Sequence, residues 1–192
     1  GRSLPSGELG ANTTLDLVAD LDYVREALGI HAWIVFGGSW GSLLALAYAQ
    51  IYPENVLGLV MHGIFLGSRE EIVAYARDLG KLLPRQERGD PLAVFARIIL
   101  HEHAERATQA ARVWLDYQRN LIGKEPLDAP PNGMQQARAC IQMHYLTRDC
   151  FLMPGQLLAG IDRIRHLPAI IVQGMADPVC PPPAAEALHR AW

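Results

Sequence analysis

The stretch Ala32-Trp33-Ile34-Val35-Phe36-Gly37-Gly38-Ser39-Trp40-Gly41 decides the fold of this 192-residue chain. Its first half, residues 32–36, is apolar and too short for a helix, which predicts a strand buried on both faces. Residues 37–41 fit the pattern G-x-S-x-G, in which a serine occupies a sharp turn between a strand and a helix. Residues 42–52 are rich in Leu and Ala and stop before a proline, as a buried helix does. This order predicts a parallel α/β sheet.

The residues around Ser39 suit a nucleophile. Side chains at positions 37 and 41 are expected to collide with the neighbouring strand and helix, because the turn is tight. The amino end of the helix favours negative charge, and the main-chain N–H of Trp40 is the expected first oxyanion donor. We expect the second donor to come from a segment before Gly1. A glycine-rich turn that only packs tightly is the weaker alternative, because the context of the pattern is met on both sides.

Periodic apolar residues extend this architecture toward both ends. Thr13 and Asp16 resemble a capping box, and the helix that follows has apolar residues at positions 17, 21, 24 and 28 before Gly29. Residues 56–61 and 167–173 are further strand candidates.

The segment between these two strand candidates has helical patterns broken by prolines and glycines. We therefore expect an α/β core interrupted by an all-helical cap. The expected limits are 1–67 and 162–192 for the core and 68–161 for the cap.

Asp177 is the candidate acid of the site. It follows the apolar run Ile170-Ile171-Val172-Gln173-Gly174, in the loop where a carboxylate can orient an imidazole. The alternative is an ordinary Asp-Pro turn residue, and position alone leaves the two interpretations nearly even.

The histidine of such a site is not found among the seven in the chain. Six of them precede Asp177, which is the wrong order for an elbow of this kind. His189 follows it, but on a helix that begins near Pro181 and is not expected to reach back to Ser39. We expect His189 to be a surface or packing residue, the catalytic histidine to lie beyond Trp192, and both ends of the chain to be cut.

Composition excludes several functions. A formal net charge of -3 and a pI near 6.2 give no basic field for nucleic acid or anionic lipid. No apolar run approaches the roughly 20 residues of a membrane span. Cys140, Cys150 and Cys180 form neither a disulfide framework nor a metal motif, so a reducing cytoplasm is expected. His101 and His103 are two residues apart and point to different faces of a helix, so no metal site is expected.

The sequence around the elbow and the acid loop resembles the proline iminopeptidase family over nearly the whole chain. The segments that carry the resemblance are Gly1-Arg2-Ser3, Asn12-Thr13-Thr14, Val35 to Ser42, Leu46 to Gln50, Gly63 to Leu66, His144-Tyr145, Asp177 to Pro181 and Leu188 to Trp192. The resemblance implies an α/β-hydrolase core with a helical cap, no metal or organic cofactor, and release of N-terminal proline from small peptides. It also implies that Asp177 is the triad acid and that the histidine follows the end of this chain.

Departures from the family concern the cap. Two family glutamates hold the free amino group of the substrate, and Gln118 and Gln142 stand in their places. An arginine that is usual in the family is His62 here. Phe65 and Tyr75 remain as apolar walls of the expected proline pocket.

Three functions stay open. The first is an iminopeptidase, and the second is an esterase or amidase of the same fold that takes a small apolar substrate without selecting a free amine. Two amides offer only dipoles to an ammonium group, whereas a carboxylate pair compensates its charge. The third is an inactive binding protein on the same scaffold. Ser39 argues against dehalogenases and epoxide hydrolases, which use an aspartate at the elbow.

Overall fold

The computed structural model describes residues 7–83, 87 and 89–192, and it divides into two compact units. The core unit comprises residues 12–71 and 151–192, and the described residues of the helical unit are 7–11, 72–83, 87 and 89–150. The core unit thus runs to Glu71 and resumes at Phe151, whereas the limits predicted from the sequence are 67 and 162. Gly1-Arg2-Ser3, which contributed to the family resemblance, lies outside the described residues.

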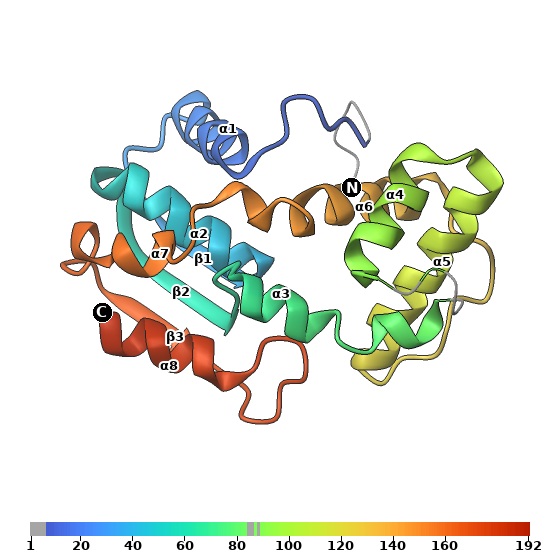
Figure 1. Ribbon diagram of the computed structural model, residues 1–192. Coiled ribbons are helices and arrows are strands. Elements are labelled where there is room, and N and C mark those ends of the chain that lie inside the picture. Colours follow the sequence, from blue (N-terminus) through green and yellow to red (C-terminus); the bar gives the residue numbers. More distant parts are fainter. Residues whose placement is uncertain (1–6, 84–86, 88) are drawn as a thin grey trace. The chain divides into compact units, whose positions relative to one another are not determined.

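A parallel sheet forms the centre of the core unit (Figure 1). Within the described residues its strand order is β1-β2-β3, with the bounds Trp33–Ser39, Val56–Ile64 and Ala169–Val172. Strand β1 pairs with β2 from Trp33 opposite Val56 to Ser39 opposite Ile64, and β2 pairs with β3 from Leu59 opposite Ala169 to His62 opposite Val172. The α/β fold expected from the sequence is confirmed.

The helices of the core unit are α1 (Thr14–Ala27), α2 (Trp40–Ile51), α7 (Gln156–Ala159) and α8 (Pro182–Ala191), with short 3-10 turns η1 (Pro53–Asn55) and η5 (Ile161–Arg163). Helix α1 begins with the expected capping box, in which the Thr13 N–H donates to Asp16 at 2.8 Å and the Asp16 N–H donates to Thr13 at 3.3 Å. It ends before Gly29, whose φ of 67° is readily adopted only by glycine.

The buried face of α1 is not the expected one. Val24 and Leu28 are 47% and 65% exposed, whereas Thr14, Val18, Asp22 and Arg25 are buried. The cause is a buried polar network around the Asp22 carboxylate. It accepts hydrogen bonds from Arg25 at 2.8 Å, from the Tyr48 hydroxyl at 2.9 Å and from Asn55 at 3.0 Å. These bonds turn the polar face of α1 toward α2.

One face of the sheet is covered by α2, and the other is open among the described residues. Leu59 and Met61 on the covered face are 1% and 0% exposed, but Ile34 and Phe36 on the opposite face are 65% and 71% exposed. The expectation that β1 is buried on both faces is therefore wrong. Side chains alternate along a strand, and α2 packs only against the face that carries Gly37.

The helical unit is built from α4 (Pro91–His101), α5 (Ala104–Leu121) and α6 (Gly133–Leu146), and α3 (Arg69–Tyr75) connects it with the core unit in sequence. Phe95, Trp114 and Met143 are fully buried among these helices. The Asp90 side chain caps α4 by accepting a hydrogen bond from the Leu92 N–H at 3.0 Å, and Asn132 is the N-cap residue of α6. The elements described between Arg69 and Phe151 are helices and 3-10 turns, and the role of this segment as a cap stays a prediction.

Candidate active site

The turn between β1 and α2 is a strained elbow that exposes Ser39. This residue has φ 52° and ψ -121°, a combination that residues with a side chain rarely adopt, and its side chain is exposed. A Cβ at Gly37 would lie 2.2 Å from the Gly41 carbonyl oxygen, so the expected collision at position 37 is confirmed. The one expected at position 41 is wrong, because a Cβ there meets no described atom within 4 Å. At Gly38 a Cβ would lie 2.1 Å from Nε2 of His62, so the exposed His62 ring would have to move to accommodate a side chain there.

Ser42 fixes the elbow to the segment after β2. Its buried hydroxyl donates to the main-chain oxygen of Ser39 at 2.7 Å and accepts from the Phe65 N–H at 3.0 Å. This role of Ser42 has no signature in the sequence, because the contact with Phe65 depends on the pairing of β1 with β2. The Trp40 and Phe65 rings also lie close, with centroids 6.4 Å apart.

Asp177 lies in the loop between β3 and α8. Its Oδ1 accepts hydrogen bonds from the main-chain N–H groups of Val179 and Cys180, both at 2.9 Å. Gln173 holds this loop in place, since its amide donates to the Cys180 carbonyl at 2.6 Å and accepts from the Ile64 N–H at 2.9 Å. The other oxygen, Oδ2, accepts no hydrogen bond from the residues that the structure describes, so it is available to a further donor.

Ser39 and Asp177 both lie close to Gly63. A Cβ at Gly63 would lie 3.7 Å from Oδ2 of Asp177 and 3.9 Å from the main-chain nitrogen of Ser39. Gly63 has φ 55° and follows His62 at the carboxyl end of β2. The two candidate residues, 138 positions apart in sequence, are thus neighbours at the carboxyl edge of the sheet, where enzymes of parallel α/β folds hold their sites.

Cys180 belongs to the same cluster. Its sulfur lies 3.5 Å from the Ser39 hydroxyl oxygen, and its side chain is buried. Burial raises the pKa of the Cys180 thiol above its ordinary value, and the charges of Asp177 and Glu71 act in the same direction, opposed by the contact with Ser39. The thiol is therefore neutral near pH 7 and is no base for Ser39.

None of the seven histidines, all of them described, is hydrogen-bonded to Ser39 or Asp177. His189 lies exposed on α8, as expected for a surface residue. His62 is also exposed, and its ring rests over Gly38 with its centroid 5.5 Å from that of Phe36. The cluster around Gly63 therefore contains a hydroxyl and a carboxylate without an imidazole between them.

The cap candidates lie in the helical unit, around a cluster of three aromatic rings. Tyr75 packs edge-on against Trp114, at 5.8 Å between centroids, and against Tyr117, at 6.3 Å. Gln142 accepts a hydrogen bond from the Trp114 indole N–H at 2.8 Å. Gln118 accepts from the Arg138 guanidinium at 3.4 Å.

Both glutamines thus use their carbonyl oxygens within the helical unit. Each oxygen keeps a second lone pair, but an amide offers an ammonium ion only a dipole, whereas a carboxylate offers a negative charge. Arg138 adds a positive charge next to Gln118, which further disfavours a cation there.

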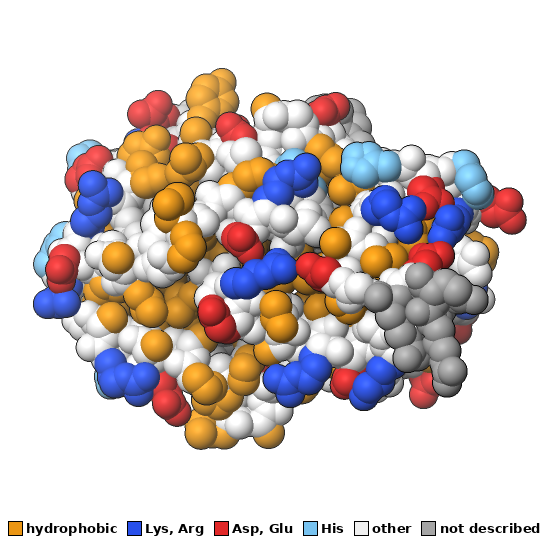
Figure 2. Space-filling view, in the orientation of Figure 1, with side chains coloured by type: hydrophobic (Ala, Val, Ile, Leu, Met, Phe, Trp, Pro, Cys, Tyr) orange, Lys and Arg blue, Asp and Glu red, His pale blue; other side chains and the backbone are white. Residues whose placement is uncertain are grey.

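On the face shown in Figure 2, Lys and Arg side chains alternate with Asp and Glu, without a continuous basic surface. No group of three His, Cys, Asp or Glu side chains that could hold a metal occurs in the described part of the chain. None of the helices described there is long and apolar enough to cross a membrane.

Comparisons with known proteins agree on one family. The model of the α/β hydrolase fold family matches residues 1–192. A probable proline iminopeptidase of Leptolyngbya boryana is 39% identical over 209 residues, an alignment that takes in 100% of this chain and 65% of that protein. The proline iminopeptidase of Neisseria meningitidis serogroup B is also 39% identical, with 100% of this chain and 67% of the relative covered.

Solved structures show the same fold. The crystal structure of proline iminopeptidase from Mycobacterium smegmatis has a TM-score of 0.54 at 20% identity and covers 100% of this chain and 65% of its own. An esterase from Exiguobacterium antarcticum has a TM-score of 0.55, also at 20% identity, with the same coverage. The chain therefore spans 65% of the length of the first curated relative and of both solved proteins.

Proposed function

Because this chain belongs to the α/β-hydrolase fold family and, within it, to the proline iminopeptidases, we propose that it carries the nucleophile and the acid of a serine hydrolase that releases N-terminal proline from small peptides. The observation that carries the proposal is the meeting of Ser39 and Asp177 beside Gly63. A cytoplasmic location is part of this proposal, because the three cysteines are all free, as is usual in a reducing compartment.

In the proposed reaction, the Ser39 hydroxyl attacks the carbonyl carbon of the N-terminal residue. The Trp40 N–H at the start of α2 stabilises the oxyanion, and the amide C–N bond then breaks. The hydroxyl proton passes through a general base to the leaving amine, and water hydrolyses the resulting ester in the same way.

We assign the role of the base to a histidine outside residues 1–192. No imidazole in this chain bonds to Ser39 or Asp177, while Oδ2 of Asp177 remains open to a donor beside Gly63. Oδ1 is already held by two main-chain N–H groups, so the carboxylate is fixed in orientation before an imidazole arrives.

Hydrolysis of a proline arylamide by the natural full-length protein tests this function. We expect Ser39→Ala to lower kcat at least about 10⁴-fold, because the residue forms the covalent intermediate. Asp177→Asn should lower kcat about 10⁴-fold, because the wrong imidazole tautomer is then favoured. His189→Gln is the control and should retain activity. An unchanged kcat in Asp177→Asn would show that Asp177 is an ordinary turn residue and not the acid of the site.

A second candidate is an amidase or esterase that does not select a free amine. It is favoured by Gln118 and Gln142, whose carbonyl oxygens are engaged by Arg138 and Trp114. The test compares a proline arylamide with its N-acetylated form and with a small neutral ester, before and after Gln118→Glu combined with Gln142→Glu.

If the second candidate is correct, the unmodified protein cleaves the acetylated and free substrates comparably, and the double change raises the preference for the free amine. Charge-assisted hydrogen bonds are worth about 1.5 to 3 kcal/mol each, so the gain in preference should be about a hundredfold or more. A strong preference for the free amine that the double change leaves unaltered would exclude it.

A further inference from the structure

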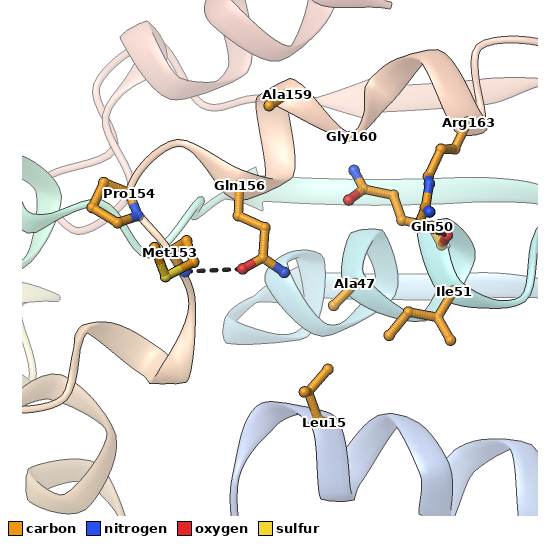
Figure 3. A pocket seen from close by; sticks show the side chains of 10 residues that line it. All are labelled: Leu15, Ala47, Gln50, Ile51, Met153, Pro154, Gln156, Ala159, Gly160 and Arg163. Carbon is orange, nitrogen blue, oxygen red and sulfur yellow. Dashed lines mark hydrogen bonds between the residues drawn. The ribbon is translucent and has the colours of Figure 1, made fainter.

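A pocket lies in the core unit at the end of α2 remote from Ser39 (Figure 3). Helix α2 has 12 residues and therefore extends for roughly 18 Å, with Ser39 before its first turn. The pocket has a volume of about 410 Å³. It is lined by α1, by the last turns of α2 and by the segment from Met153 to Arg163.

The walls of this pocket are largely apolar. Leu15, Ile51 and Met153 line it and are 54%, 39% and 73% exposed. Ala47 and Ala159 contribute only small side chains. Small side chains between larger apolar ones leave room for an apolar group, as in binding sites for small molecules.

Gln50 supplies a buried polar group. It is 7% exposed, and its amide NH2 donates to the Leu157 carbonyl at 2.7 Å. Its carbonyl oxygen accepts no hydrogen bond from any described residue. A Cβ at Gly160 would lie 2.2 Å from this oxygen, so the glycine is what lets Gln50 occupy its position. This oxygen is not enclosed by protein, so it can accept a hydrogen bond from a molecule bound in the pocket that Gln50 lines.

Gln156 and Arg163 supply donors. The Gln156 carbonyl oxygen accepts from the Met153 N–H at 2.9 Å, which leaves the NH2 group turned toward Gln50 in Figure 3. Arg163 donates one hydrogen bond to the main-chain oxygen of Gln50 at 3.3 Å. No carboxylate of the described residues lies within ion-pair distance of Arg163, and the pocket lining contains no acidic side chain. Arg163 is exposed, and its guanidinium keeps donors that can bind an anion at the edge of the pocket.

We propose that this pocket binds a small carboxylate that carries an amide N–H and an apolar side chain, as the C-terminal residue of a peptide does. The carboxylate binds Arg163 and the Gln156 amide, the N–H donates to the Gln50 carbonyl oxygen, and the apolar group lies among Leu15, Ile51 and Met153. This site is independent of Ser39 and of the function proposed for it.

Ligand-observed NMR with N-acetyl-L-leucine as the probe tests the proposal, with N-acetyl-L-leucinamide as the neutral analogue. We expect saturable binding of the acid and at least about tenfold weaker binding of the amide, since a charge-assisted hydrogen bond is lost. Arg163→Gln should weaken binding of the acid about tenfold or more. Arg165→Gln is the matched control, because that arginine bonds to the Ala191 carbonyl and Asp162 outside the pocket and should leave binding unchanged.

Ala159→Phe places a large side chain in the pocket and should abolish binding. Because Ala159 is exposed, this change should not lower the melting temperature. Ser39→Ala should leave binding unaltered, which separates this site from the active site. Equal binding of acid and amide, or equal loss in the two arginine variants, would overturn the proposal. Absence of binding of the acid to the unmodified, folded protein would overturn it as well.

Discussion

The Cys180 sulfur lies 3.5 Å from the Ser39 hydroxyl oxygen, so any group added to this thiol occupies the space beside the candidate nucleophile. Because burial raises the pKa of Cys180, the thiolate is scarce near pH 7 and increases only at alkaline pH. We expect iodoacetamide to modify Cys180 slowly at neutral pH and faster as the pH rises, with loss of Ser39 reactivity in parallel. Peptide mass spectrometry measures the modification.

The control for this experiment is Cys180→Ala, which should keep Ser39 reactive and make it insensitive to iodoacetamide. Inactivation of Cys180→Ala at the same rate as the unmodified protein would place the sensitive thiol elsewhere.

Ser42→Ala should destabilise the core unit by about 1–3 kcal/mol, because the Phe65 N–H then loses its buried acceptor. Urea unfolding measures the change. Ser68→Ala is the matched variant, because the Ser68 hydroxyl accepts a hydrogen bond from the Glu71 N–H in a less buried position. It should lower the free energy of unfolding by less than Ser42→Ala does. Equal costs for the two variants would show that the Ser42 hydroxyl does not hold the elbow.

The two outer glycines of the elbow should respond differently to alanine. At Gly37 the added Cβ would lie 2.2 Å from the Gly41 carbonyl oxygen, which is a main-chain atom and cannot move aside. We therefore expect Gly37→Ala to lower the free energy of unfolding by about 3 kcal/mol or to prevent folding. At Gly41 the Cβ meets open space within α2, and the change should be neutral or stabilising by up to about 1 kcal/mol. Thermal unfolding compares the two variants, and a reversed order would contradict the elbow geometry.

The Asp22 network should make stability depend on pH. Hydrogen bonds from Arg25, Tyr48 and Asn55 hold the pKa of Asp22 below its ordinary value, against the effect of burial. Its contribution is therefore present above the unfolded-state pKa and is lost as the pH falls through the folded-state pKa. Asp22→Asn should flatten this acid limb of a plot of unfolding free energy against pH. A limb of unchanged slope in Asp22→Asn would show that other carboxylates cause it.

Tyr48→Phe tests the same network without changing a charge. The Tyr48 hydroxyl donates to Asp22 at 2.9 Å in a fully buried position, so its removal should cost about 1 kcal/mol. Tyr23→Phe, at a 73% exposed position, should cost nothing measurable. Urea unfolding at neutral pH compares the two variants. Equal free energies of unfolding would mean that the hydrogen bond from Tyr48 to Asp22 contributes little to stability.

Local features were predictable from the sequence, because each depends on residues close together in the chain. The capping box of Thr13 and Asp16 and the elbow at Ser39 are of this kind, and both are present. Asp177 was also found in the expected loop, since chain order alone places it after a strand. Its role as the acid stays a prediction.

Features that depend on distant residues were missed. The apolar stripe of α1 suggested the wrong buried face, because Tyr48 and Asn55, far along the chain, decide where Asp22 points. Ser42 and Cys180 carried no signal of their own, since their contacts with Phe65 and Ser39 exist only after the strands have paired. The openness of the sheet face with Ile34 and Phe36 likewise depends on which helices pack there, which periodicity does not reveal.

Labelling of the natural full-length protein with a fluorophosphonate, followed by peptide mass spectrometry, tests the central claim most directly. A nucleophile at a strained elbow with its acid fixed nearby should react at Ser39 alone, and Ser39→Ala should abolish labelling. Ser68→Ala should be labelled like the unmodified protein. A phosphonate found on another residue, or labelling that persists in Ser39→Ala, would contradict the assignment of Ser39 as the nucleophile.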